Sequence, residues 1–149
     1  MKRTFSLAFS CLLSAQAQVP RFEDYPEQEI FKGKPAPPKI VRPRDRLYRT
    51  RIREGAAQGP NFAGHYTVAS WGCGAGCVSM VLVDAKTGIV YGAPFQDLAW
   101  GGPADEPLEY KLTSTLIIVH GCPGEKDCAT YYYQWTGSAF KLLRKDTAR

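Results

Sequence analysis

The fold is decided by a central stretch of the chain, residues 78–91 (VSMVLVDAKTGIVY). Residues 78–83 are mostly apolar and rich in valine, and residues 89–91 (IVY) form a second run of residues that favour strands. Between them lies DAKTG, residues 84–88, whose last glycine can adopt the left-handed conformation that a short hairpin loop requires. The stretch therefore predicts two antiparallel strands joined by this loop.

Further strand patterns lie on both sides of this hairpin. In residues 130–135 (TYYYQW), alternation places Tyr131, Tyr133 and Trp135 on one face of a strand. The connections are short, and about six or seven strands in this arrangement predict a mostly antiparallel β-sheet. The other expected strands are residues 64–71, 108–113, 116–120, 129–135 and 139–143.

One helix is expected before the sheet. In residues 44–57, Tyr48, Ile52 and Ala56 recur every four residues and share one helical stripe, with Leu47 beside it. Gly59 and Pro60 then end the pattern. Together, a short amphipathic helix and an antiparallel sheet define an α+β fold.

The segment before this helix, residues 18–43, contains six prolines. It is therefore predicted to be an extended arm that either lies over the domain or stays mobile. Residues 44–149 are predicted to form a single sheet-rich domain stapled by disulfides. A chain of this size can bury a sizeable core as one domain.

The N-terminus has the features of a signal peptide. A cationic start, residues 1–3, is followed by an uncharged apolar run, residues 4–14, and by the cleavage-type sequence AQA at residues 15–17. These features predict cleavage after Ala17 and a mature protein that is periplasmic or secreted. The apolar run is too short to span a bilayer, for which about 20 residues are needed, so no transmembrane segment is expected. A lipoprotein anchored at Cys11 is the less favoured alternative, because residues 8–9 (AF) fit a lipobox poorly.

The cysteines predict a disulfide framework. Cys11 leaves with the signal peptide, and the even number that remains allows three connectivities. The turn-forming glycines of residues 73–77 (CGAGC) and the Pro-Gly pair in residues 122–128 (CPGEKDC) favour two local bridges. The expected disulfides thus use Cys73, Cys77, Cys122 and Cys128. A zinc site is the weaker alternative, because export is oxidising and no paired CxxC spacing is present, and no metal or cofactor is expected.

The candidate binding residues lie in two places. In residues 59–66 (GPNFAGHY), His65 is close to Asn61 and Tyr66 in sequence, so the three residues can form a polar site. The structural alternative, which local sequence rules favour, is that this segment shapes a turn while His65 and Tyr66 fill the sheet. Trp100 lies in a long segment, residues 92–107, and long loops inside compact domains are often functional.

No catalytic residue is assigned. None of the HExxH, GxSxG, P-loop or GxGxxG patterns is present. A peptidase that uses Cys73 or Cys77 with His65 or His120 needs a free thiolate, which an even set of cysteines in an oxidising compartment disfavours. A group of acids fits either glycoside chemistry or, more commonly, a solvated rim. These acids are Asp97, Asp105, Glu106 and Glu109.

A set of basic residues surrounds the predicted helix, with only Asp45 among them. They are Lys39, Arg42, Arg44, Arg46, Arg49, Arg51 and Arg53. Such a set can contact anionic lipid, lipopolysaccharide or an acidic protein, or it can be an ordinary solvated helix face, and both interpretations remain open. The whole chain has a formal charge of +5, part of which leaves with Lys2 and Arg3, so no nucleic-acid partner is expected.

Several of these segments resemble a family of small exported proteins of Gram-negative bacteria. They are RTRIREG, GPNFAGHY, WGCGAGC and VDAKTG, together with the later YYYQW. The resemblance implies export and the limits of the domain. It supplies no activity, so no catalytic residue is carried over from it.

Two functions follow as expectations. The first is a small exported binding protein, such as an inhibitor or immunity protein that acts against an envelope-directed hydrolase. Its contacts would be the loop of residues 122–128, Trp100 and His65. The second is an envelope hydrolase with a site around His65, and a purely structural envelope role is a third possibility. An enzyme is the less favoured class, and the sequence specifies neither the partner nor the oligomeric state.

Overall fold

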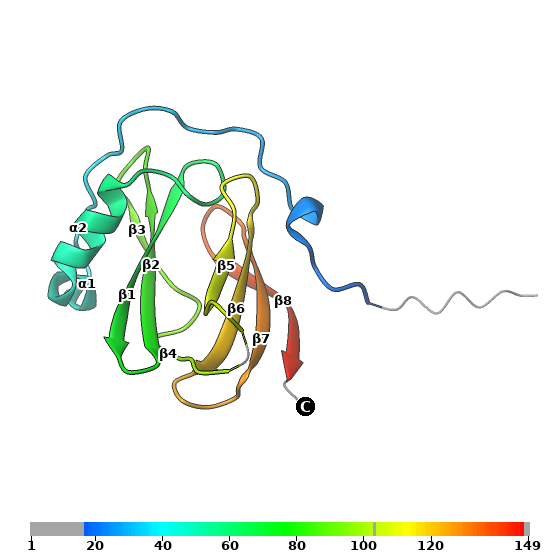
Figure 1. Ribbon diagram of the computed structural model, residues 1–149. Coiled ribbons are helices and arrows are strands. Elements are labelled where there is room, and N and C mark those ends of the chain that lie inside the picture. Colours follow the sequence, from blue (N-terminus) through cyan, green and yellow to red (C-terminus); the bar gives the residue numbers. More distant parts are fainter. Residues whose placement is uncertain (1–16, 103, 148–149) are drawn as a thin grey trace, which may run out of the picture.

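The computed structural model describes residues 17–102 and 104–147 (Figure 1). The predicted signal peptide up to residue 16, and with it Cys11, lies outside the described residues. None of the described helices has the length and apolar character that crossing a membrane would require. The elements in chain order are η1 (Phe22–Asp24), α1 (Pro43–Leu47), α2 (Arg49–Ala57), β1 (Tyr66–Gly74), β2 (Cys77–Asp84), β3 (Val90–Gly92), β4 (Leu98–Ala99), β5 (Leu108–Tyr110), β6 (Leu116–Pro123), β7 (Ala129–Trp135) and β8 (Phe140–Thr147).

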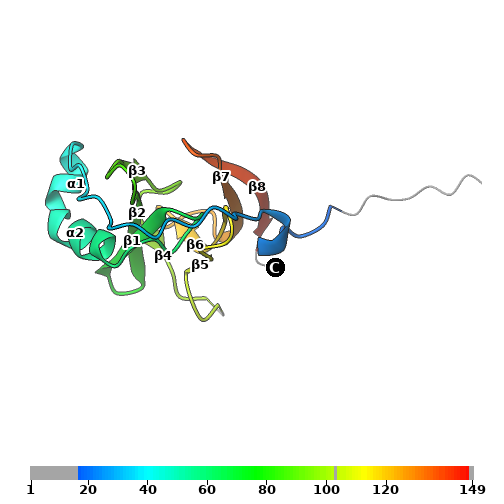
Figure 2. The ribbon, with the colours of Figure 1, turned by 90° about the horizontal axis from the view of Figure 1, so that it is seen from above.

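The sheet is antiparallel throughout and consists of two halves that face each other. The strand order is β1-β2-β4-β6-β7-β8, with β3 paired to β2 and β5 paired to β6. Seen from above, the half made of β1–β3 lies opposite the half made of β5–β8 (Figure 2). The predicted fold class is confirmed, with eight strands among the described residues instead of six or seven. The strand missing from the expectation is β4, which has only two residues and so shows no periodicity.

The hairpin of residues 78–91 forms as its sequence predicts. β2 and β3 pair in antiparallel register, with Val83 opposite Val90. The Asp84 carboxylate accepts hydrogen bonds from the Lys86 amide (2.8 Å) and the Thr87 hydroxyl (2.9 Å). Gly88 has a φ of +76°, as expected for the glycine that ends the loop.

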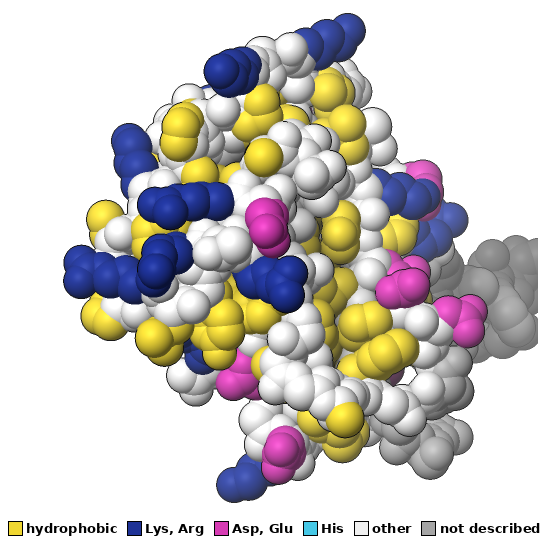
Figure 3. Space-filling model, turned by 60° about the vertical axis from the view of Figure 1, so that its left-hand side comes forward, with side chains coloured by type: hydrophobic (Ala, Val, Ile, Leu, Met, Phe, Trp, Pro, Cys, Tyr) yellow, Lys and Arg dark blue, Asp and Glu magenta, His cyan; other side chains and the backbone are white. Residues whose placement is uncertain are grey.

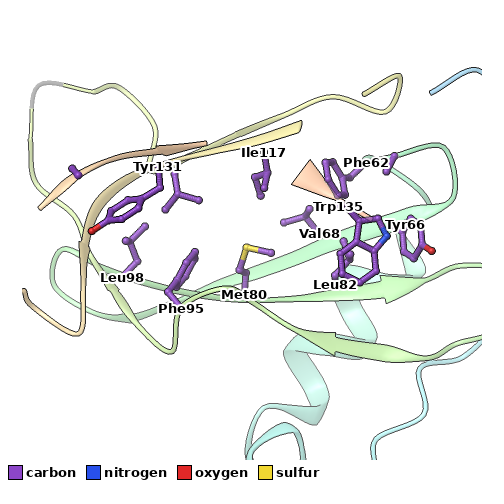
Figure 4. Close-up of a cluster of buried hydrophobic side chains, with 13 residues drawn as sticks. Phe62, Tyr66, Val68, Met80, Leu82, Phe95, Leu98, Ile117, Tyr131 and Trp135 are labelled. Carbon is purple, nitrogen blue, oxygen red and sulfur yellow. The ribbon is translucent and has the colours of Figure 1, made fainter. Parts of the chain in front are cut away.

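The main core fills the space between the two halves of the sheet (Figure 4). Val68 and Leu82 reach it from β1 and β2, and Ile117 reaches it from β6. Tyr131 and Trp135 lie in this core and Tyr133 packs against it, so the predicted shared face of these three residues is confirmed. Contacts from both halves hold the sheet folded over on itself.

The predicted helix forms as two pieces, α1 and α2, that meet at Tyr48. Ile52 and Ala56 are buried against the outer face of β1 and β2, and the Tyr48 ring stacks on Trp71 with ring centroids 4.9 Å apart. The expectation for Leu47 is wrong, because this side chain is 79% exposed. Leu47 ends α1, and the change of direction at Tyr48 turns it away from the stripe that α2 buries.

The proline-rich arm runs along one end of both sheet halves, at the top of Figure 1. Five backbone hydrogen bonds attach it to the domain: Thr115 N–H to Tyr25 O, Glu27 N–H to Thr113 O, Phe31 N–H to Gly64 O, Ala36 N–H to Ala85 O and Lys39 N–H to Gly88 O. The contact at Gly88 is close, because an added Cβ would lie 2.2 Å from the Pro37 carbonyl oxygen. The arm therefore covers the end of the sheet at which β1 begins.

Candidate functional site

Both disulfides lie at the end of the sheet opposite the arm. Cys73–Cys77 closes the turn between β1 and β2, and Cys122–Cys128 closes the turn between β6 and β7. The two predicted local bridges are thus confirmed. The zinc site and the thiol peptidase both need thiolates, and these four sulfurs are all oxidised. The side chains of Cys73, Cys77 and Asp97 do converge within 4.8 Å, but with the two sulfurs joined in a disulfide they offer no thiolate for a metal.

The long segment of residues 92–107 ties the two disulfide turns together through β4. Ala99 is the register partner of both Cys77 on β2 and Cys122 on β6. The next residue, Trp100, donates its backbone N–H to the Gly76 carbonyl at 2.7 Å. On the other side, Gly124 donates its N–H to the Asp97 carbonyl at 3.0 Å. Three loops that are distant in sequence therefore form one connected end of the molecule, which we call the disulfide end.

A pocket of about 610 Å³ opens at the disulfide end, between Trp100 and the ends of β6, β7 and β8. Its size falls in the range of small-molecule or side-chain binding pockets. Its wall includes His120, Thr130 and the Cys122–Cys128 bridge. The indole Nε1 of Trp100 is buried here and has no hydrogen-bond partner within the described part of the chain. The same is true of the indole Nε1 atoms of Trp71 and Trp135, so the unpaired N–H does not by itself distinguish Trp100.

His120 is held in this wall by groups on both neighbouring strands. Its Nδ1 lies 3.1 Å from the Thr130 hydroxyl on β7, and its Nε2 lies 2.5 Å from a Glu109 carboxylate oxygen on β5. His120 and Thr130 are direct register partners. From the sequence, His120 is expected only as a possible peptidase base and Glu109 only as one of several acids. Their contact depends on strand register, so only correct pairing of the three strands could have revealed it.

His65 lies at the other end of β1, beside the arm. Its Nε2 is 3.9 Å from an Asp84 carboxylate oxygen, and its ring lies against Tyr66 with centroids 4.1 Å apart. Burial lowers the pKa of His65, and the nearby Asp84 carboxylate opposes this effect. No hydroxyl or thiol makes a hydrogen bond to this ring in the region that the structure describes. The described contacts of His65 are thus the Asp84 carboxylate and the Tyr66 ring.

The other two residues of that motif have structural contacts. The Asn61 side chain accepts a hydrogen bond from the Val68 N–H at 2.7 Å and donates one to the Val68 carbonyl at 3.3 Å. Tyr66 is buried in the main core, with its ring 5.3 Å from that of Trp135, and burial raises the pKa of Tyr66. The structure thus joins Trp100 to the Cys122–Cys128 loop and separates both from the Asn61, His65 and Tyr66 group.

The acids in and just after the long segment do not act as a pair. Asp97 accepts hydrogen bonds from Arg44 (2.7 Å) and from the Ser79 hydroxyl (2.5 Å), whereas Glu109 contacts His120. Asp105 and Glu106 are exposed. The carboxylates of this group either have separate partners or face solvent, as in the solvated rim that the sequence also allowed. The group offers no paired acid and base for glycoside chemistry.

No family model, curated protein or solved structure matches this chain. The resemblance to exported proteins of Gram-negative bacteria therefore stays a prediction, and functional inference rests on the fold and on the disulfide end.

Proposed function

We propose that this chain is an exported binding protein, periplasmic or secreted after cleavage behind Ala17, that inhibits an envelope-directed hydrolase. The contact surface in this proposal is the disulfide end. The observation that carries it is the double pairing of Ala99 with Cys77 and Cys122, which connects the Trp100 segment to both disulfide turns. Two disulfide bonds support the oxidising compartment that the proposal requires.

A surface of this kind suits recognition of a protein. Loops that are already fixed lose little conformational entropy on binding, so more of the contact energy appears as affinity. Tryptophan is among the residues that most often dominate the energy of protein interfaces. Trp100 supplies a large ring to the wall of the pocket at the disulfide end.

The second candidate function is a hydrolase with His65 in its site. Its support is the carboxylate of Asp84 near the His65 ring, an arrangement that can orient a histidine base. Among the described residues no hydroxyl or thiol makes a hydrogen bond to this ring, and for this reason the binding protein is the preferred proposal.

The test is inhibition of purified peptidoglycan hydrolases on labelled peptidoglycan, with muramidases, lytic transglycosylases, amidases and endopeptidases as the panel. We expect one class to lose activity at near-stoichiometric amounts of the mature protein. A Trp100→Ala variant should weaken that inhibition by about 30-fold, the effect of losing an interface hot spot of about 2 kcal/mol. Gln28→Ala is the matched control, because Gln28 is exposed on the arm at the opposite end.

The proposal is refuted if the protein inhibits none of these hydrolase classes. It is also refuted if Trp100→Ala and Gln28→Ala weaken the inhibition equally. The same samples test the second candidate when no other enzyme is added. If the protein alone cleaves peptidoglycan, and a folded His65→Ala variant does not, the result favours the hydrolase.

A further inference from the structure

Positive charge without a counter-charge gathers on the side of the molecule formed by α2 and the adjoining arm. Arg42 and Arg44 do not belong to it, because they pair with Asp45 and Asp97. Arg51 is also excluded, since it lies 3.6 Å from Glu54. The remaining exposed bases of this side make no ion pair within the described residues, and we call them the basic face. They are Lys34, Lys39, Arg46, Arg49 and Arg53.

These bases are neighbours in space. Arg49 and Arg53 are four residues apart on α2 and so project from one stripe of the helix. Arg49 donates a hydrogen bond to the Arg46 carbonyl at 3.1 Å, which brings α1 into the same surface. Arg53 lines a small hollow with arm residues 35–38, the segment that Lys34 and Lys39 flank. Figure 3 shows this side with dark blue side chains standing out from the surface and yellow ones between them.

Two large apolar side chains of the same stretch of chain are exposed. Val41 is 66% exposed and lies two residues after Lys39, while Leu47 is 79% exposed and follows Arg46. Neither contributes to the core clusters. Exposed aliphatic groups among bases are typical of segments that lie on a bilayer, where the cations meet headgroups and the apolar groups enter the acyl boundary.

We propose that the basic face docks onto an anionic lipid bilayer. Lys34, Lys39 and the three arginines contact the lipid phosphates, and Leu47 and Val41 insert below them. Nucleic acid offers no apolar layer for these two side chains, so the bilayer is the occupant that accounts for both the charge and the exposed aliphatics. This docking does not depend on the hydrolase partner. It leaves the disulfide end free, because the helices cover the outer face of β1 and β2 whereas the disulfide turns lie at the ends of the strands (Figure 1).

The experiment is co-sedimentation of the purified mature protein with vesicles of phosphatidylcholine alone or mixed with phosphatidylglycerol. Binding should require phosphatidylglycerol and should fall steeply as salt rises, because screening shortens the reach of surface charge. Each base near an anionic surface contributes about five-fold in affinity, so Arg49→Gln with Arg53→Gln should weaken binding by about 25-fold. The matched control removes the same charge elsewhere, as Lys126→Gln with Lys141→Gln, two exposed bases outside the basic face.

The apolar part is tested by Leu47→Ser, which should weaken binding without changing its salt dependence. All variants should keep the unfolding midpoint of the parent protein, since the substituted side chains are exposed. Equal losses in the two double variants would mean that net charge alone drives binding and would overturn the proposal. Binding to phosphatidylcholine alone, or tighter binding to RNA than to the mixed vesicles at equal salt, would overturn it as well.

Discussion

Replacing Ile52 by alanine tests whether α2 is held to the sheet by its apolar stripe. Ile52 is fully buried between α2 and the strands it covers. The change removes three carbon atoms, which at about 0.8 kcal/mol per methylene costs about 2.4 kcal/mol of transfer free energy. A cavity of about 80 Å³ that did not relax would add about 2 kcal/mol. We therefore expect the free energy of unfolding to fall by about 2.5 to 4.5 kcal/mol.

Leu47→Ala is the matched control, because it also removes three carbons from the same helical region. Leu47 is 79% exposed, so this change should cost less than about 0.5 kcal/mol. Urea denaturation followed by tryptophan fluorescence measures both values under one condition. Similar losses for the two variants, or a loss below about 1 kcal/mol for Ile52→Ala, would refute the placement of α2.

Three further predictions concern pH, the disulfides and the arm. Because burial lowers the pKa of His65, the unfolded chain binds this proton more tightly, and stability should fall as pH drops below about 6.5. Denaturation at several pH values should show that the free energy of unfolding depends less steeply on pH in His65→Asn than in the parent protein. An unchanged dependence would contradict the lowered pKa of His65. Replacing Cys122 and Cys128 together by alanine opens one short loop and should cost about 2 kcal/mol in the chain-entropy model, measured by thermal unfolding. Gly88→Ala should cost about 1–3 kcal/mol, because alanine is strained at this positive φ and its Cβ would meet the Pro37 carbonyl. Limited proteolysis should then cut the arm of this variant faster than that of the parent protein, and equal rates would mean that the arm is not held at Gly88.

The hairpins were predictable because their signals are local. Alternation in residues 130–135 placed Tyr131 and Trp135 on the buried face correctly, and the glycine of residues 84–88 identified the turn. The disulfide pairing was also accessible, since glycines and Pro-Gly between the cysteines permit short loops. In each case the deciding residues are close in sequence.

Features that depend on tertiary contacts were not predictable from the sequence. β4 has two residues and exists because β2 and β6 pair with it from both sides. Leu47 matched the helical pattern, yet the break at Tyr48 exposes it. The contacts of His120 with Thr130 and Glu109 require the register of three strands, which no local pattern supplies.

We propose that the chain is exported and closes both of its disulfides at one end to form a binding surface. The most direct test of this proposal is the intact mass of the protein purified from the periplasm of a Gram-negative host and alkylated with and without prior reduction. We expect an N-terminus at Gln18 and four cysteines that are labelled only after reduction. A chain that keeps its first 17 residues, or a cysteine that is labelled without reduction, would contradict the proposal.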